Sequence, residues 1–392
     1  MTNARRAAWR EWLWPRAETK ESRAGALIAL SLTGRPVWTP RDFERMTRNG
    51  FARNAVAYRC VRMIAESAAS VPWTLFEGER ELAAHPLLDL LARPNPADTG
   101  AGLMEHLYGY LQTSGNAYLE AASVGGEIRE LYALRPDRMK VIPGASGWAQ
   151  GFEYAVNGQT ARFARAEDGF LPVLHLKLFN PLNDHYGMSP AEAASAAIDI
   201  HNASADWGKA LLDNGARPSG ALVYKGTDAA PNLSDQQFAR LKEELESQYQ
   251  GAQNAGRPLL LEGGLEWRPL SLSPEEMDLS GVRYAAAREI ALAFGVPPML
   301  LGIPGDATYN NYREANLAFW RQTALPLVAR TAQALTNWLR PRFGPGLRLS
   351  FDADAVDALN VERESLWSRI GAADYLTTDE KRAAVGYGKL EG

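Results

Sequence analysis

The sequence predicts an α+β protein with a long helical region and a small α/β insertion in its second half. Three observations carry this prediction: apolar residues at helical spacing from residue 54, alternating residues around a Gly-Gly pair, and alanine-rich helical runs after residue 189. The 392 residues are 46% hydrophobic and 22% charged. These values allow a sizeable core and exclude a mainly disordered, collagenous or coiled-coil chain.

The first domain is expected over residues 50 to 180. Val56, Cys60, Ile64 and Ser67 share one face of a helix that should stop before Val71-Pro72, because proline disfavours a helical predecessor. Cys60, the only cysteine, is then a core residue, and a disulfide framework is excluded. The remaining predicted elements are the strand VPWTLFEG, the helices HPLLDLLARP and TGAGLMEHLYGYLQTSG, a hairpin NAYLEAASVGGEIRELYAL, and the strands RMKVIP, GFEYAVNG and FLPVLHLKLF.

A long helix is predicted after Ser189-Pro190, with serine as the cap and proline in the first turn, and it should run to Asn214-Gly215. Alanines encircle this helix instead of forming one stripe; they stand at positions 191, 193, 194, 196, 197, 203, 205 and 210. Such a helix suits packing on more than one side, either inside a monomer or between copies in a ring.

The insertion follows as the strand SGALVYKG, the helix LSDQQFARLKEELESQYQG and the strand pair GRPLLLEGG and LEWRPLSL. Glu243, Glu244 and Glu246 of its helix are expected to face solvent or a partner without binding metal. The next helix should open at Ser273-Pro274 and end at Gly295.

The loop LGIPGDATYNNY precedes a last long helix that extends to about Arg340. Pro326 lies inside this helix, where it removes a backbone donor and clashes with the carbonyl of Gln322. We therefore expect a kink near residues 322 to 326.

The charge balance excludes a protein whose whole surface grips nucleic acid. There are 42 basic and 46 acidic side chains, for a net charge of −4. Residues 1 to 60 nevertheless hold 12 basic and 5 acidic side chains, so the basic N-terminal arm, residues 1–49, is either a docking or nucleic-acid arm or a solvated terminus. The apolar run at residues 26 to 30 is too short to cross a membrane, and we expect neither a signal peptide nor a transmembrane helix.

Four passages resemble the portal proteins of long-tailed double-stranded DNA phages and of gene transfer agents, and the resemblance covers about residues 50 to 385. They are GARPSGALVYKG, LSDQQFARLKEELESQYQG, NAGRPLLLEGGLEWRPLSLSPEEMDL and REIALAFGVPPMLLGIPGDATYNNYREANLAFWRQTALPLV.

The resemblance implies a portal fold with named parts. They are a wing (50–188 and 313–350), two stem helices (189–215 and 274–298), a clip (216–273), a tunnel loop region (299–312) and a short helical crown (351–392). It further implies a DNA-facing tunnel loop, although a plain surface loop between helices is the alternative. The loop comprises Ile303, Pro304, Gly305, Asp306, Ala307, Thr308, Tyr309, Asn310, Asn311 and Tyr312. These residues lack Lys and Arg, as suits a channel past which a phosphate backbone slides.

The implied function is a ring, expected to have twelve subunits, through which DNA is packaged and ejected at one capsid vertex. The implied partners are double-stranded DNA, the major capsid protein, the terminase large subunit and a head–tail adaptor. No contact with a membrane is implied. The implied location is a virion or phage-like particle, assembled in the host bacterial cytoplasm. Whether that particle is a phage or a gene transfer agent stays open.

Enzyme signatures are weak. The chain has no GxxxxGK[ST] loop, GxSxG elbow or HExxH helix, and we expect no catalytic residue, cofactor or metal. The alternative is a metal-dependent hydrolase that uses Asp352, Asp354 and Asp357, although aspartates before a helix commonly act as caps. Five separated histidines are expected to be structural or exposed; they are His85, His106, His175, His185 and His201. Thr377 and Glu380 resemble a capping box.

Overall fold

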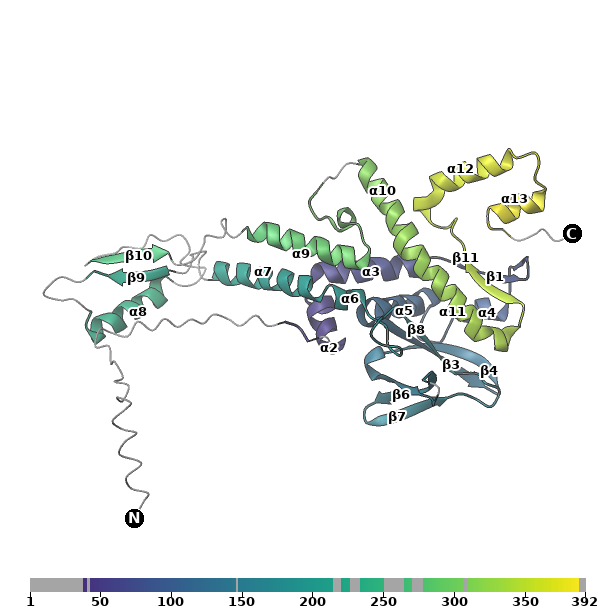
Figure 1. Cartoon of the computed structure of the whole chain (residues 1–392), viewed down its shortest axis with the longest axis horizontal. Helices are drawn as coiled ribbons and strands as arrows, with labels where there is room; N and C mark the ends of the chain where they lie inside the picture. Colours follow the sequence, from purple (N-terminus) through teal and green to yellow (C-terminus); the bar gives the residue numbers. More distant parts are fainter. Residues whose placement is uncertain are drawn as a thin grey trace, which may run out of the picture. The chain divides into compact units, whose positions relative to one another are not determined.

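A computed structural model describes residues 38–40, 43–145, 147–213, 220–225, 233–249, 264–269, 278–305 and 309–387. The chain forms two compact units. One consists of Met1–Val37 and Trp207–Met277, and the other of Trp38–Asp206 and Asp278–Gly392. Figure 1 labels the helices and strands of both units. The mixture of helices and antiparallel sheets confirms the predicted α+β class.

Helices α3 (Ala55–Ala69) and α5 (Gly100–Ser114) pack together in the larger unit. Asn54 caps α3 by accepting hydrogen bonds from the backbone N–H groups of Val56 and Ala57. Cys60 and Ile64 are fully buried, which confirms the predicted core face. The preceding segment holds α2 (Phe43–Met46) and the π-helix η1 (Thr47–Ala52), and α4 (Pro86–Ala92) lies between α3 and α5 in the chain.

A first antiparallel sheet joins the beginning of the larger unit to its end. Strand β1 (Trp73–Glu77) pairs with β2 (Arg80–Leu82) on one side and with β11 (Leu347–Phe351) on the other. Trp73 lies opposite Phe351 in this register. Strand β2 was not predicted, because its three residues are too few to show an alternating pattern.

The predicted hairpin is present. Strands β3 (Asn116–Val124) and β4 (Glu127–Leu134) flank Gly125 and Gly126, whose φ angles of 62° and 87° suit the tight turn that glycine allows. Strand β8 (Val173–Lys177) pairs with the other edge of β3.

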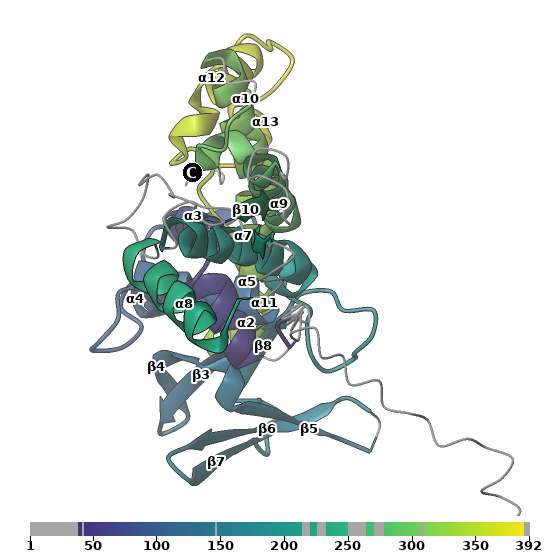
Figure 2. The same cartoon turned by 90° about the vertical axis from the view of Figure 1, so that its left-hand side faces the viewer.

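A third sheet has the order β5-β6-β7, with β5 (Met139–Pro143), β6 (Ala149–Val156) and β7 (Gln159–Ala164). The short 3₁₀ helix η2 (Pro136–Arg138) precedes it. Figures 1 and 2 both place this sheet on the far side of the β3–β4 hairpin from α3. The sequence did not predict β7, whose residues are mostly exposed and so lack an apolar face.

The helix predicted from Ser189 is divided. The Ser189 hydroxyl accepts from the N–H of Glu192, as predicted, but α6 (Pro190–Ala193) stops after one turn and α7 (Ser195–Asp213) begins after Ala194. Helix α9 (Leu279–Phe294) is capped by Asp278 and ends at Gly295, whose φ is 67°. Ser273 and Pro274, which were expected to open this helix, lie outside the described residues.

After α9 the 3₁₀ helix η4 (Pro298–Leu301) leads to a run of helix with three parts: α10 (Tyr309–Phe319), the π-helix η5 (Trp320–Ala324) and α11 (Leu325–Phe343). Helix α11 continues beyond the expected end near Arg340 and contains Pro341 in its last turn. The chain then forms β11, the 3₁₀ helix η6 (Asp357–Leu359), α12 (Asn360–Gly371) and α13 (Thr378–Ala384).

The described part of the smaller unit contains β9 (Gly220–Tyr224), α8 (Asp235–Tyr249) and β10 (Leu265–Pro269), with β10 antiparallel to β9. The predicted strand GRPLLLEGG lies outside the described residues except for Gly264. Of the three glutamates singled out in α8, Glu243 is exposed, and the side chains of Glu244 and Glu246 lie outside the described residues. Among the described helices, none is both long and apolar enough to span a membrane.

Candidate functional site

The connection from α9 to α10 contains the first part of the predicted tunnel loop, Ile303 to Thr308. Gly295 closes α9 in the left-handed conformation, and its N–H bonds back to the carbonyl of Leu292 at 3.0 Å. Pro297 and Pro298 cannot continue the helix and instead begin the single turn η4. Gly302, with φ of 71°, ends that turn and directs the chain toward Ile303.

Arg288 of α9 holds the start of the loop. Its guanidinium donates a hydrogen bond to the carbonyl of Pro304, and a Cβ added at Gly305 would overlap the same guanidinium. A cavity of about 280 Å³ lies beside this contact. Its lining residues are Arg288, Pro297, Pro298, Met299, Ile303, Gly305, Asn311 and Ala315. The sequence indicated a loop without Lys or Arg, whereas the fold brings the Arg288 cation to the base of this loop. No local sequence pattern indicates a contact between positions 288 and 304.

The predicted loop is shorter than expected. Tyr309 to Tyr312 form the first turn of α10, and the prediction that they belong to a loop is wrong. Tyrosine and asparagine are only mildly unfavourable in helices, so the helical run can extend over them. Ile303 is half-buried, and Pro304 and Gly305 are exposed. Asp306, Ala307 and Thr308 lie outside the described residues.

The exposed first turn of α10 presents polar uncharged groups. Asn310, Asn311 and Tyr312 are all exposed, and Tyr312 keeps 51% of its surface. Arg313 follows and pairs with the carboxylate of Glu314 at 3.6 Å. The described segment therefore offers exchangeable hydrogen bonds together with a cation whose charge is partly balanced by its neighbour.

The region of Pro326 departs from a regular α-helix. The N–H of Leu325 bonds to the carbonyl of Trp320, five residues earlier, and this wider turn places Pro326 within the first turn of α11. The π-turn breaks the regular α-helical hydrogen-bond pattern at this point, where proline has no N–H to donate. The irregularity lies where the kink was predicted; the size of any bend stays a prediction. The Thr323 hydroxyl of the same turn donates to the carbonyl of Gly295 at 2.6 Å.

The three aspartates of the hydrolase hypothesis make local structural contacts. Asp352 accepts from the N–H of Asp354 at 2.9 Å, and Asp357 accepts from the side chain of Asn360 at 3.4 Å. Asp354 forms an ion pair with Arg363 and accepts a 2.8 Å hydrogen bond from the Tyr387 hydroxyl. This last contact raises the pKa of Tyr387. No contact of these carboxylates favours a catalytic role, and the described residues contain no group of three side chains suited to a metal ion.

The histidines contact different partners. The His85 ring caps α4 by accepting from the N–H of Leu87 at 3.1 Å. The His201 ring lies 3.1 Å from the amide nitrogen of Asn54, and burial, with Arg283 nearby, lowers its pKa. His106 lines a cavity of about 290 Å³ beside α3 and α5. The backbone N–H of His185 donates a hydrogen bond to the side-chain oxygen of Asn183.

His175 is the most strongly perturbed titratable group among the histidines of the described residues. Its ring stacks on Tyr118 with centroids 4.3 Å apart, and its Nε2 lies 3.0 Å from the side-chain oxygen of Asn116. Burial, with the neighbouring Lys177 and His185, lowers its pKa to about 3. The ring is therefore neutral near pH 7 and donates to Asn116, which in turn accepts from the N–H of Gly187 at 2.7 Å.

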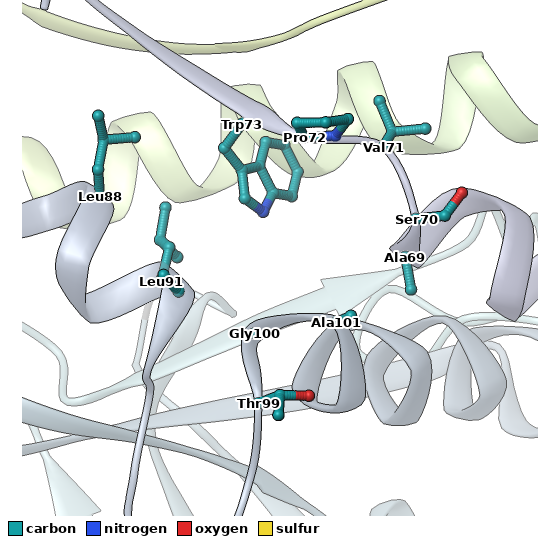
Figure 3. A pocket seen from close by; sticks show the side chains of 11 residues that line it. Ala69, Ser70, Val71, Pro72, Trp73, Leu88, Leu91, Thr99, Gly100 and Ala101 are labelled. Atoms are coloured by element: carbon teal, nitrogen blue, oxygen red, sulfur yellow. The ribbon is translucent and has the colours of Figure 1, made fainter. Parts of the chain in front are cut away.

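A cavity of about 430 Å³ lies between the end of α3, the start of β1, α4 and the start of α5 (Figure 3). Val71, Trp73, Leu88 and Leu91 supply its apolar side chains, and Gly100 lets α5 approach the carbonyl of Leu91. Its lining holds no acidic, basic or thiol side chain, and its two hydroxyl groups make local contacts: Ser70 donates to the carbonyl of Ser67, and Thr99 accepts from the N–H of Gly102.

Comparison with known proteins agrees with the predicted resemblance. The family described as Phage portal protein matches residues 55–386. In a solved structure of the neck of an empty gene transfer agent particle, one chain is 52% identical, with a TM-score of 0.71 over 91% of this chain and 96% of that one. A chain in the neck of a native gene transfer agent particle, determined with C12 symmetry, is 51% identical with a TM-score of 0.68 and the same coverage.

A more distant relative comes from a phage. The portal protein of Enterobacteria phage HK97 is 26% identical over 351 residues, which cover 86% of this chain and 80% of the relative. The family match begins at the first turn of α3 and ends after α13, so it spans nearly all of the larger unit and the insertion within it. The chain therefore belongs to the phage portal protein family.

Proposed function

We propose that this chain forms a ring of twelve subunits in the neck of a gene transfer agent or phage particle and that DNA passes through the ring. One observation carries the proposal: a chain 51% identical over 91% of this sequence occurs in a particle neck determined with C12 symmetry. The protein acts as a conduit, without catalysis of its own.

The segment from Ile303 to Tyr312 faces the DNA. Two features support this role. The Arg288 guanidinium anchors the start of the segment to α9, and the exposed groups that follow, Asn310 and Tyr312, are uncharged. A conduit must release each phosphate as DNA moves, so weak hydrogen bonds suit it better than a row of cations, which would hold DNA tightly at low salt.

The other partners follow from the same role. The major capsid protein surrounds the ring at one vertex, and the terminase large subunit and later a head–tail adaptor dock at the insertion, residues 216–273. Assembly takes place in the cytoplasm of the bacterial host. Helix α8 of the insertion supports docking, because its described exposed face carries charged groups such as Asp235, Arg240 and Glu243.

Electron microscopy of the purified protein tests the ring directly. Class averages viewed along the axis should show twelvefold rings, and light scattering should give about twelve times the subunit mass of 43.0 kDa. A monomer or dimer under all assembly conditions would contradict the proposal.

Deletion of the gene from its host tests the conduit. Particles should then contain no nuclease-protected DNA, and a plasmid copy should restore it. Normal DNA content in the absence of this chain would show that another protein forms the conduit.

A further inference from the structure

Helices α7 and α9 each have one face in the core of the larger unit and one face outside it. The N-terminal half of α7 lies beside α9, in opposite chain directions, and Figures 1 and 2 agree on this arrangement. The core face of α9 consists of Ala286, Ala287, Ile290, Ala291 and Phe294, all at most 4% exposed. It packs on α3 and α6. The outer faces have no such cover among the described residues.

The outer face of α9 carries a regular stripe. Val282, Ala285, Glu289 and Leu292 are all exposed, and they follow one another in steps of three, four and three residues. Val282 keeps 42% and Leu292 79% of its surface. This spacing is the one with which helices pack in coiled-coil seams, and two of its members, Val282 and Leu292, are large apolar side chains that stand exposed.

A second stripe with the same spacing lies on α6 and α7. Ala193, Ala196, Ile200 and Ala203 are exposed and also follow in steps of three, four and three. Their opposite face, which includes Ile198, is buried. The stripe contains no charged side chain, and three of its four members are alanine, which lets another helix approach closely.

The two stripes complement each other in size when the helices run in opposite directions. The four positions of one stripe then face the four positions of the other, and each facing pair, here called a level, combines an alanine with one larger side chain. The pairs are Ala193 with Leu292, Ala196 with Glu289, Ile200 with Ala285, and Ala203 with Val282. Equal steps keep all four levels aligned. Glu289 is the one charged member, and a single polar residue in an apolar seam favours one register over its neighbours.

The occupant of each stripe is a second copy of this chain. Closed rings use contacts between two different faces of each subunit, and the particle neck that contains the similar chain has C12 symmetry. If the ring axis is parallel to the helices, rotation about it leaves their directions unchanged. Helix α7 of one subunit then runs in the opposite direction to α9 of the next. We propose that the Ala193–Ala203 stripe of one subunit packs against the Val282–Leu292 stripe of the next, and this inference rests on the proposed ring.

Disulfide trapping tests the pairing in the full-length protein. Cys60 is fully buried, and burial raises the pKa of its thiol to about 12, so the native cysteine does not compete. Oxidation of the A193C/L292C double variant, assembled as rings, should give a ladder of covalent oligomers on a denaturing gel. The A203C/V282C variant should give the same ladder, because it tests the other end of the same register.

Controls separate a contact between subunits from one within a subunit. A193C alone and L292C alone should remain monomeric on the gel, and a mixture of the two should give dimers and nothing larger. The A203C/L292C variant is out of register by ten residues, about 15 Å along a helix, and should give no ladder.

The outcomes distinguish this inference from the proposed function. Rings that are normal in the electron microscope but give no ladder with either in-register variant would show that other faces join the subunits; the conduit would stand and the pairing would be wrong. A ladder from A203C/L292C equal to the in-register ladders would also overturn the stated register. If no variant and no wild-type protein forms rings, the proposed ring and the pairing both fail.

Discussion

The Thr323 hydroxyl donates a 2.6 Å hydrogen bond to the carbonyl of Gly295 and so ties the π-helix η5 to the end of α9. The two residues are held close, since a Cβ added at Gly295 would lie 2.9 Å from the same hydroxyl oxygen. A carbonyl at a helix end needs a partner from outside the helix, and Thr323 supplies it. The contact links α9, which carries one of the proposed ring stripes, to the long helix that contains Pro326.

Replacing Thr323 by valine keeps the side-chain shape and removes this donor. We expect T323V to lower the free energy of unfolding by about 1 kcal/mol, because the Gly295 carbonyl loses its partner. Urea denaturation followed by circular dichroism measures the change. T323S keeps the hydroxyl and should lie within about 0.5 kcal/mol of the wild type; equal losses in both variants would show that packing of the methyl group, and not the hydrogen bond, is responsible.

Two separate features require glycine at position 115: its positive φ angle and its close contact with the backbone of another segment. Its φ is 73°, and a Cβ there would lie 2.6 Å from the Met188 carbonyl carbon and 2.7 Å from the Ser189 nitrogen, which are backbone atoms. We expect G115A to lower the free energy of unfolding by about 3 kcal/mol or to prevent folding, since strain and overlap add. The matched control is G125A in the β3–β4 turn, where φ is 62° but no atom lies within 4 Å of the added Cβ. It should cost about 1 kcal/mol, and equal costs at both positions would contradict the overlap argument.

His175 should make stability depend on pH. Burial, with Lys177 and His185 nearby, lowers its pKa from 6.5 to about 3, so between these values the unfolded chain binds a proton that the folded chain does not. Stability is therefore lost as the pH falls through this window, by at most about 1.4 kcal/mol per pH unit from this group. Unfolding free energies at pH values of about 7, 6 and 5 should fall less steeply in H175Q than in the wild type. Parallel curves for the two proteins would show that His175 is not the group responsible.

Asp354 joins Arg363 of α12 to Tyr387 near the end of the described chain. We expect D354N to lower stability by about 1 to 2 kcal/mol, because Arg363 and Tyr387 lose a charged acceptor, while Mg²⁺ or Mn²⁺ has no effect on either protein. Thermal melts with and without each cation, and with a chelator, provide the measurement. Stabilisation of the wild type by a divalent cation that D354N abolishes would instead support the metal-dependent hydrolase hypothesis.

Asn310 provides a test of the proposed DNA-facing segment. It is exposed in the first turn of α10, and N310K would add a cation to each subunit of a ring. We expect normal rings but slower filling of particles with DNA, and the defect should shrink as salt rises because phosphate contacts weaken with ionic strength. Nuclease-protected DNA per particle is the readout, with N310Q as the uncharged control. A defect that is equal in N310Q, or unchanged by salt, would contradict contact with the phosphate backbone.

The sequence by itself determined the elements that depend on neighbouring residues. The Ser189 cap, the Gly125-Gly126 turn, the Gly295 helix end and the Thr377–Glu380 capping box are all present as predicted. Each depends on the backbone preference or short-range hydrogen bond of residues a few positions apart, which a linear pattern records. The family resemblance, predicted over residues 50 to 385, agrees with the match over residues 55–386.

The tertiary structure decided which distant residues meet. Nothing near Trp73 indicates that it lies opposite Phe351, and nothing near Arg288 indicates that it holds Pro304. Such contacts follow from packing of whole elements, whose partners are chosen by shape and burial rather than by local preference. The π-turn at Trp320–Ala324, just before Pro326, also contains such a contact, the hydrogen bond from Thr323 to Gly295, which lies 28 residues earlier in the chain.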